Sequence, residues 1–390
     1  MNRQLLLSFQ GPHHPEILSR LGALLDSWPV RLLDLHGLEQ DQIFSGLWQL
    51  EWTSEQGPQL MEKSLCSLMQ EFDMQFRLSQ SEAQPKREQR FILTLLGEHL
   101  STSLLAQLLQ RLQQEELLVH GLQPLESQHL RVLELQLRTH QQLDRPRLLR
   151  DLLPLHQQHH VDFALQPESL FRRHKRLIVF DADMTFIQCE IINEMSQLVG
   201  CEAEVKVLTE AAMRGELDFE EALRARVRLL KGLHRDDLQS LLRQLPYTPG
   251  VRRLVRVLKQ LGYKLALLSG GFQLFVDHIC EEFHLDYGFA NSLEWQDGRL
   301  TGELLGEIVD GQRKAQLLQE IAAREGIVPE QVVAIGDGAN DVQMLAIAGL
   351  GIAFNAKPVL QERASGQLNQ PNLDALLYFL GLSGQELANC

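Results

Sequence analysis

Four short apolar runs between residues 176 and 354 limit the possible folds of the chain more than any other feature. They read RLIVF, KLALLS, VVAIGD and LGIAF, and each is followed by a turn and a segment with helical character. Such continuous apolar runs are typical of strands in a parallel sheet, because helices cover both faces of the sheet and bury the side chains on each. The sequence therefore predicts an α/β fold with a Rossmann-like parallel sheet in residues 171–390.

A charged, helix-favouring stretch separates the first two of these runs. It covers residues 194–250 and carries almost no strand signal. Because strands that belong to one sheet flank it, we interpret it as a helical cap inserted into the α/β domain.

The first 170 residues differ in composition from the rest of the chain and are rich in Leu, Gln and His. Strand-like and helix-like segments follow one another in the order βαββαβ up to about Ser79. The same order recurs after a polar stretch. The sequence therefore predicts two small α+β domains, at 1–82 and 89–168, in front of the domain at 171–390.

Composition and charge exclude several classes of protein. The chain has 390 residues and a net charge of -14, and its basic residues are interspersed with acids, so we expect no nucleic acid or anionic membrane as partner. The five cysteines are scattered and fit reduced thiols. No apolar run approaches the roughly 20 residues of a membrane span. We expect a cytoplasmic protein.

Acidic and small residues follow three of the four runs. Because ligands of parallel sheets bind beyond the carboxyl ends of the strands, these side chains should meet in one crevice. They are Asp181, Asp183, Ser269, Gly270, Gly271, Asp337, Asn340 and Asp341. Carboxylate oxygens are the preferred ligands of Mg²⁺, and a magnesium site with few carboxylates usually serves a phosphate group.

Two further features suit a phosphoryl group. Ser269 and the two glycines after it let a hydroxyl and backbone N–H groups approach an anion. Lys314 offers a compact cation. With metal and phosphate present, one aspartate can act as nucleophile and another as general acid and base.

These motifs resemble the haloacid dehalogenase superfamily. DADMT is similar to its DxDxT signature, and SGG, a later lysine and GDGANDVQML resemble its other three motifs in order, between Arg176 and about Ala356. The resemblance implies Asp181 as nucleophile and Asp183 as general acid and base. It also implies Mg²⁺ held by Asp181, Asp337 and the backbone carbonyl of Asp183, and phosphate held by Ser269, Gly270, Lys314 and Asn340.

A narrower resemblance concerns the predicted cap. TEAAMRGELDFEEALRARVRLLKGL is similar to the cap of the phosphoserine phosphatase family. It implies that Glu190 and Arg226 hold the serine ammonium and carboxylate, with Met213 and Phe219 closing the pocket. The pattern alone does not separate Arg226 from its neighbours Arg224 and Arg228, which point in different directions around a helix.

The two N-terminal repeats resemble ACT domains, which often bind amino acids and pair side by side. GPHHPEILSRLGALL carries this resemblance in the first copy, whereas the second copy lacks the proline that leads into the helix. The resemblance implies a homodimer and serine binding at these domains.

Together, these resemblances imply a Mg²⁺-dependent phosphoserine phosphatase. Such an enzyme hydrolyses O-phospho-L-serine to L-serine and phosphate through an aspartyl-phosphate, the last step of serine biosynthesis. Two alternatives stay open: a phosphatase for another small phosphorylated amino acid or alcohol, and a serine-binding regulatory protein whose phosphatase domain is vestigial.

Overall fold

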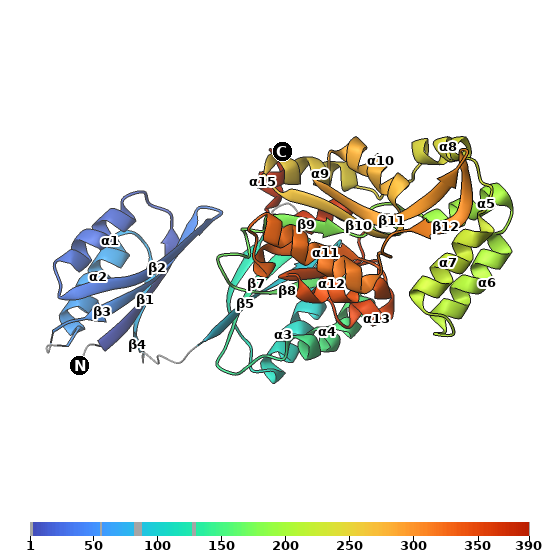
Figure 1. The fold of residues 1–390 in the computed structure, drawn as a ribbon. Helices are drawn as coiled ribbons and strands as arrows, with labels where there is room; N and C mark the ends of the chain where they lie inside the picture. Colours follow the sequence, from blue (N-terminus) through green and yellow to red (C-terminus); the bar gives the residue numbers. More distant parts are fainter. Residues whose placement is uncertain (1–2, 55–56, 82–87, 127–129, 390) are drawn as a thin grey trace. The chain divides into compact units, whose positions relative to one another are not determined.

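The computed structural model describes residues 3–54, 57–81, 88–126 and 130–389. By its internal contacts the chain divides into two compact units, Met1–Arg87 and Glu88–Cys390 (Figure 1). In the described part of the chain, no helix is long and apolar enough to cross a membrane.

The first unit is a four-stranded antiparallel sheet with two helices on one face. Its strands lie in the order β2-β3-β1-β4. Alternate residues of β1, namely Leu5, Leu7 and Phe9, are buried in one core with side chains of both helices. The elements are β1 (Arg3–Pro12), α1 (Ile17–Asp26), β2 (Val30–Gln40), β3 (Ile43–Trp52), α2 (Gln59–Glu71) and β4 (Gln75–Ser81). The predicted βαββαβ order is confirmed.

The second unit begins with another copy of this arrangement, which we call the second module (88–167). Its strands lie in the order β6-β7-β5-β8, and α3 and α4 share one core with the face of the sheet that they cover. The elements are β5 (Gln89–Leu96), α3 (Thr102–Gln114), β6 (Leu118–Pro124), β7 (Val132–Thr139), α4 (Arg145–His159) and β8 (Asp162–Pro167).

The parallel sheet follows, and it confirms the predicted Rossmann-like fold. Its strands lie in the order β11-β10-β9-β13-β14-β15, each parallel to its neighbours. Alternate residues of β9 enter two different cores, Ile178 with α9 and α10 on one face and Val179 with α11 and α12 on the other. The strands are β9 (Leu177–Phe180), β10 (Lys264–Phe272), β11 (Tyr287–Gln296), β13 (Val332–Gly336), β14 (Leu350–Phe354) and β15 (Gly366–Leu368).

Helices connect and cover these strands. The covering helices are α9 (Val251–Gln260), α10 (Gln273–Phe283), α11 (Gly311–Arg324), α12 (Val342–Ile347), α13 (Pro358–Gln361), α14 (Leu376–Phe379) and α15 (Gly384–Ala388). Short 3₁₀ turns are η1 (Arg235–Asp237), η2 (Pro329–Gln331), η3 (Ala339–Asp341) and η4 (Leu373–Ala375).

The second module and the parallel sheet form one continuous sheet. Strand β8 pairs antiparallel with β15, and Gly366 lies opposite Ala164. The resulting sheet has eleven strands, with β12 (Arg299–Leu305) antiparallel to β11 at its other end. The prediction of separate domains at 89–168 and 171–390 does not anticipate this shared sheet.

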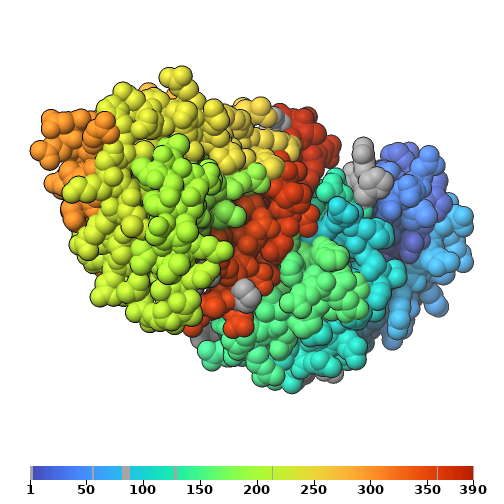
Figure 2. All heavy atoms as spheres, turned by 90° about the vertical axis from the view of Figure 1, so that its right-hand side faces the viewer, coloured from blue at the N-terminus to red at the C-terminus, as the bar shows by residue number. Residues whose placement is uncertain are grey.

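Helices occupy the predicted cap. They are α5 (Ile191–Val199), α6 (Glu202–Met213), α7 (Phe219–Leu229) and α8 (Leu238–Arg243). Helices α6 and α7 pack against each other, and α7 also contacts β12. Figure 2 shows the cap, in green and yellow, bordering on the red C-terminal residues. The cap thus covers one end of the parallel sheet.

Candidate active site

A cavity of about 470 Å³ lies where the chain leaves the carboxyl ends of the parallel strands. Strand β9 ends at Phe180, immediately before Asp181, and β13 ends at Gly336, immediately before Asp337. Most of the predicted site residues line the cavity: Asp181, Asp183, Glu190, Arg226, Gly270, Asp337 and Asn340. The other two, Ser269 and Lys314, are 2% and 0% exposed.

Lys314 is the central cation of this site. It lies in the first turn of α11, and its Nζ donates to Asp181 Oδ1 and, at 2.8 Å, to Asp341 Oδ1. Burial alone lowers the pKa of a lysine, but these two carboxylates raise the pKa of Lys314 above its ordinary value. The side chain is therefore a fixed positive charge at the end of the sheet.

The acids of the site outnumber this cation. Burial, and next the charge of Asp341, raise the pKa of Asp181 well above its ordinary value. Burial and then Glu190 raise the pKa of Asp183 to about 7, and burial and then Asp341 raise the pKa of Asp337 to about 6. The carboxylates repel one another, so an added divalent cation would be bound favourably here.

The geometry of three of these acids fits a metal ion. Asp181, Asp337 and Asp341 each place a carboxylate oxygen within 4.8 Å of the other two. The predicted ligand set named the backbone carbonyl of Asp183 and did not include Asp341. Here Asp341 joins the cluster directly, while also accepting from the N–H of Gly338 at 3.2 Å.

The SGG segment lies inside β10 rather than in a loop after it. The register between β10 and β11 shifts between Leu268 and Phe272, and the N–H of Gly271 donates to Ser269 Oγ at 2.8 Å. A Cβ on Gly271 would lie 3.1 Å from Asp183 Oδ2, and one on Gly270 would lie 3.1 Å from the ring of Phe219. Glycine therefore lets the backbone approach the acids closely.

Asn291 of β11 fixes this irregular segment. Its buried Nδ2 donates to the carbonyls of Gly270 and Gly271, at 2.9 and 3.2 Å, and its Oδ1 accepts from the N–H of Val309 at 2.8 Å. The side chain thereby determines which way the peptide groups of the SGG segment face. It belongs to no motif, and nothing in its local sequence marks it.

The cap contributes the other wall of the cavity. The guanidinium of Arg226 donates to the carbonyl of Ala222 at 3.2 Å and to Thr209 Oγ1 at 3.3 Å. Burial lowers the pKa of Arg226, and Glu190 is the first of the charges that oppose this shift. Glu190 itself lies at the N-terminus of α5.

The structure separates the three arginines that the pattern left equivalent. Arg226 lines the cavity, whereas Arg224 pairs with Glu220 at 2.7 Å and Arg228 lies 3.5 Å from Glu303. Phe219 also lines the cavity; the side chain of Met213 lies outside what the structure describes.

Two lining residues with polar side chains escaped prediction, Thr209 and Lys357. Lys357 follows β14 and donates its backbone N–H to the carbonyl of Asp337 at 3.1 Å. The signal for Lys357 was present, since LGIAF was recognised as a strand of the same sheet and the chain must leave it at the same edge. Thr209 lies in a helix and carries no comparable signal.

Comparison with known proteins identifies the family. Residues 178–346 match the haloacid dehalogenase-like hydrolases. A phosphoserine phosphatase of Methanocaldococcus jannaschii is 43% identical over 206 residues, which are 53% of this chain and 98% of that protein. The chain therefore belongs to the haloacid dehalogenase-like hydrolase family.

Further relatives agree with this membership. A phosphoserine phosphatase of Archaeoglobus fulgidus is 52% identical over 225 residues, covering 58% of this chain and 65% of that protein. The crystal structure of a hydrolase of the same family from Salmonella enterica serovar Typhi has a TM-score of 0.64 at 31% identity, covering 75% of this chain and 98% of that one. The chain spans only 55–65% of the length of three of its curated relatives.

Proposed function

We propose that this protein is a phosphoserine phosphatase, which hydrolyses O-phospho-L-serine to L-serine and phosphate. The observation that carries the proposal is the composition of one cavity. The cavity combines Asp181, which is paired with Lys314, and the partly exposed Asp183 with Glu190 and Arg226. The last two suit the ammonium and carboxylate of a small amino acid. Two of the relatives described above carry this name.

Asp181 is the proposed nucleophile. Its carboxylate attacks phosphorus, the bond between phosphorus and the seryl oxygen breaks, and an aspartyl-phosphate forms on Asp181. Lys314 donates to this carboxylate, and its charge lowers the pKa of Asp181 against the rise caused by burial and Asp341, which favours the ionised nucleophile. The same ammonium, the hydroxyl of Ser269, the N–H groups of the SGG segment and the amide of Asn340 are proposed to hold the phosphoryl oxygens.

Asp183 is the proposed general acid and base. A pKa of about 7 means that a large fraction of this side chain is protonated at neutral pH. The protonated form gives its proton to the seryl oxygen as that oxygen leaves. The carboxylate then takes a proton from the water that attacks the aspartyl-phosphate, which releases phosphate and restores Asp181.

Mg²⁺ is the proposed cofactor, and the donor set of the cluster fits it. Asp181, Asp337 and Asp341 would hold the ion, with the backbone carbonyl of Asp183 as a further ligand. When bound, it supplies positive charge that reduces the repulsion among the carboxylates and attracts a phosphate group.

Glu190 and Arg226 are proposed to select the substrate. A ligand whose ammonium meets Glu190 and whose carboxylate meets Arg226 satisfies two charges that otherwise face the cavity. Sugar phosphates and nucleotides lack both groups.

Phosphate release from a panel of phosphorylated metabolites tests this function, with and without Mg²⁺, for the unaltered protein and for Asp181→Asn. We expect L-phosphoserine to exceed phosphothreonine, sugar phosphates and nucleotides, and activity to vanish without metal or without Asp181. A better substrate elsewhere in the panel would replace the proposed specificity. Tight serine binding without turnover of any compound would favour the regulatory alternative.

The remaining expectations stay predictions. They are serine binding at the N-terminal modules, a homodimer and a cytoplasmic location. The four described cysteines, Cys66, Cys189, Cys201 and Cys280, are free thiols.

A further inference from the structure

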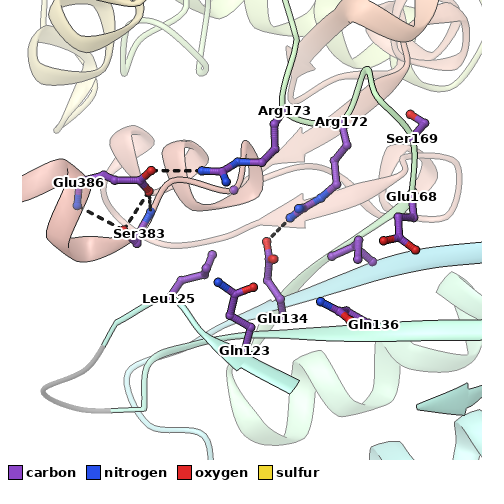
Figure 3. A pocket seen from close by; sticks show the side chains of 12 residues that line it. Gln123, Leu125, Glu134, Gln136, Glu168, Ser169, Arg172, Arg173, Ser383 and Glu386 are labelled. Atoms are coloured by element: carbon purple, nitrogen blue, oxygen red, sulfur yellow. Dashed lines mark hydrogen bonds and ion pairs between the residues drawn. The ribbon is translucent and has the colours of Figure 1, made fainter. Parts of the chain in front are cut away.

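Two cavities of the second unit hold basic side chains in different ways. One, of about 500 Å³, has both of its guanidinium groups paired, Arg172 with Glu134 and Arg173 with Glu386, as Figure 3 shows. The other is the catalytic cavity, which Lys357 lines. In the part of the chain that the structure describes, the ammonium of Lys357 has no hydrogen-bond or ion-pair partner. The catalytic cavity thus contains a cation that is available to a ligand.

The backbone of Lys357 is fixed beside the acids of the cavity. Its N–H donates to the carbonyl of Asp337 at 3.1 Å, and its carbonyl accepts from the N–H groups of Leu360 and Gln361 at 3.0 and 3.3 Å. Burial and then Asp341 raise the pKa of Asp337, and the charge of Lys357 is the first to oppose this rise. The ammonium therefore lies near the acids, although it pairs with none of the described ones.

Lys357 lies at the solvent side of the cavity, which we call its rim. Its side chain is exposed, and so is that of Val359, which lines the same cavity two residues further on. Lys314, in contrast, is 0% exposed and is paired with Asp181 and Asp341. A ligand that enters from solvent therefore meets one lysine at the rim and another at the bottom.

The charges around the cavity make a cation at the rim useful. Four acids line it: Asp181, Asp183, Glu190 and Asp337. Among the described residues of the lining, the basic ones are Arg226 and Lys357. The chain as a whole has a net charge of -14. A phosphate monoester carries about -1.5 to -2 charges at pH 7, so these acids repel it unless a nearby cation attracts it.

We propose that Lys357 is a substrate-binding residue whose ammonium attracts and binds the phosphate group at the rim, before that group reaches Ser269 and Lys314. This inference rests on the proposed function, because it assigns the residue to the phosphate end of that substrate. Lysine suits the role, since its ammonium is a compact charge with three donors on a flexible stem. Arg226 is proposed for the carboxylate at the other end, so the two lining cations serve different groups.

Lys357→Gln tests this role in the steady-state kinetics of the full chain with Mg²⁺ and L-phosphoserine. At an ionic strength of about 0.01 M, kcat/KM should fall about tenfold while kcat changes less than about twofold, because the lost charge acts on the approach of the substrate. At about 1 M the screening length falls to about 3 Å. The difference in kcat/KM between the two proteins should then nearly disappear.

Binding of inorganic phosphate gives a second readout that does not depend on the identity of the substrate. Isothermal titration calorimetry at about 0.15 M ionic strength should give a Kd for phosphate that is about fivefold higher for Lys357→Gln, as for the loss of an exposed ion pair. If L-phosphoserine is not hydrolysed, the proposed function fails, and this Kd still decides the role of Lys357.

Two control variants make the result specific. Lys357→Arg keeps the charge and should restore kcat/KM, its dependence on salt and the Kd for phosphate to within about twofold. Lys206→Gln removes an exposed lysine of α6 that does not line the cavity, so it changes the net charge of the chain equally. It should leave all three quantities unchanged.

Three results would overturn the proposal. They are an unchanged kcat/KM and Kd for phosphate in Lys357→Gln, equal effects of Lys206→Gln, and a fall in kcat at unchanged kcat/KM. The first means that Lys357 does not meet the phosphate, the second that only net charge matters, and the third that the residue acts on a later step. Because the ammonium of Lys357 has no partner among the described residues, the variants should fold normally, and unchanged thermal unfolding verifies this.

Discussion

The residues at the strand ends of the catalytic cavity, which we call its floor, and the residues of its cap-side wall hold their charges in different ways. On the floor, Lys314 is fully buried and its ammonium is fixed by two carboxylates, Asp181 and Asp341. On the wall, the half-buried guanidinium of Arg226 is held by one hydroxyl and one carbonyl of the cap itself. The floor is thus preorganised before a substrate arrives, while the wall keeps its charge for the ligand. Changes in the floor should lower kcat, and changes in the wall should raise KM.

Lys314→Met should have the largest effect. It leaves Asp181 and Asp341 buried without their cation, and removing one partner of a buried ion pair destabilises a protein by roughly 3–5 kcal/mol. We expect loss of activity and a lower free energy of unfolding, measured by urea denaturation. Lys63→Met, at an exposed lysine of the first unit, is the matched control and should change neither.

Asp183→Asn should be next. The amide cannot donate a proton to the leaving oxygen or take one from water, so kcat should fall about 100-fold or more while the fold is kept. Steady-state kinetics with L-phosphoserine measure this. Near-normal kcat would mean that Asp183 is not the acid and base, and that the floor tolerates loss of this charge.

Arg226→Ala tests the wall. KM for L-phosphoserine should rise about 10- to 100-fold, the range expected for a lost charged hydrogen bond of roughly 1.5–3 kcal/mol. Phosphoethanolamine lacks the carboxylate, so its KM should change little. Arg224→Ala, which changes a neighbouring arginine paired with Glu220, is the control. Equal effects of both variants on both substrates would remove the distinction between the arginines.

Thr209→Val should have the smallest effect. It removes the hydroxyl that accepts from Arg226 at 3.3 Å and leaves the volume of the side chain nearly unchanged. KM for L-phosphoserine should rise about fivefold, because a typical hydrogen bond contributes about 1 kcal/mol, with kcat kept. Thr209→Ser retains the hydroxyl and should restore KM. A fall in kcat alone would show that wall and floor are not separable in this way.

The sequence predicted the residues at strand ends well and the supporting residues poorly. Asp181 and Asp337 directly follow apolar runs that form parallel strands, so one topological rule brings them together. Asn291 and Thr209 act through contacts with Gly270 and Arg226 that are distant in the chain. Local patterns carry no information about such contacts.

The shared sheet was missed for the same physical reason. The predicted βαββαβ order of the second module depends on local periodicity and is confirmed. Its pairing through β8 with β15 joins residues about 200 positions apart, and a three-residue strand such as GQL has no period to detect. The SGG segment was expected beyond the carboxyl end of its strand, yet the structure keeps it within β10, where the register shifts.

The pairing of β8 with β15 has a consequence during synthesis on the ribosome. Residues 1–87 hold a complete core of their own, so they have every contact that their fold requires soon after they emerge. The second module has its helices and strands by residue 167, but its edge strand β8 has no pairing partner until Gly366 of β15 has been synthesised. At about 5–20 residues per second, that interval lasts roughly 10–40 s. For that time β8 is an additional open edge, so we expect this strand to expose the nascent second module to aggregation until β15 has been synthesised.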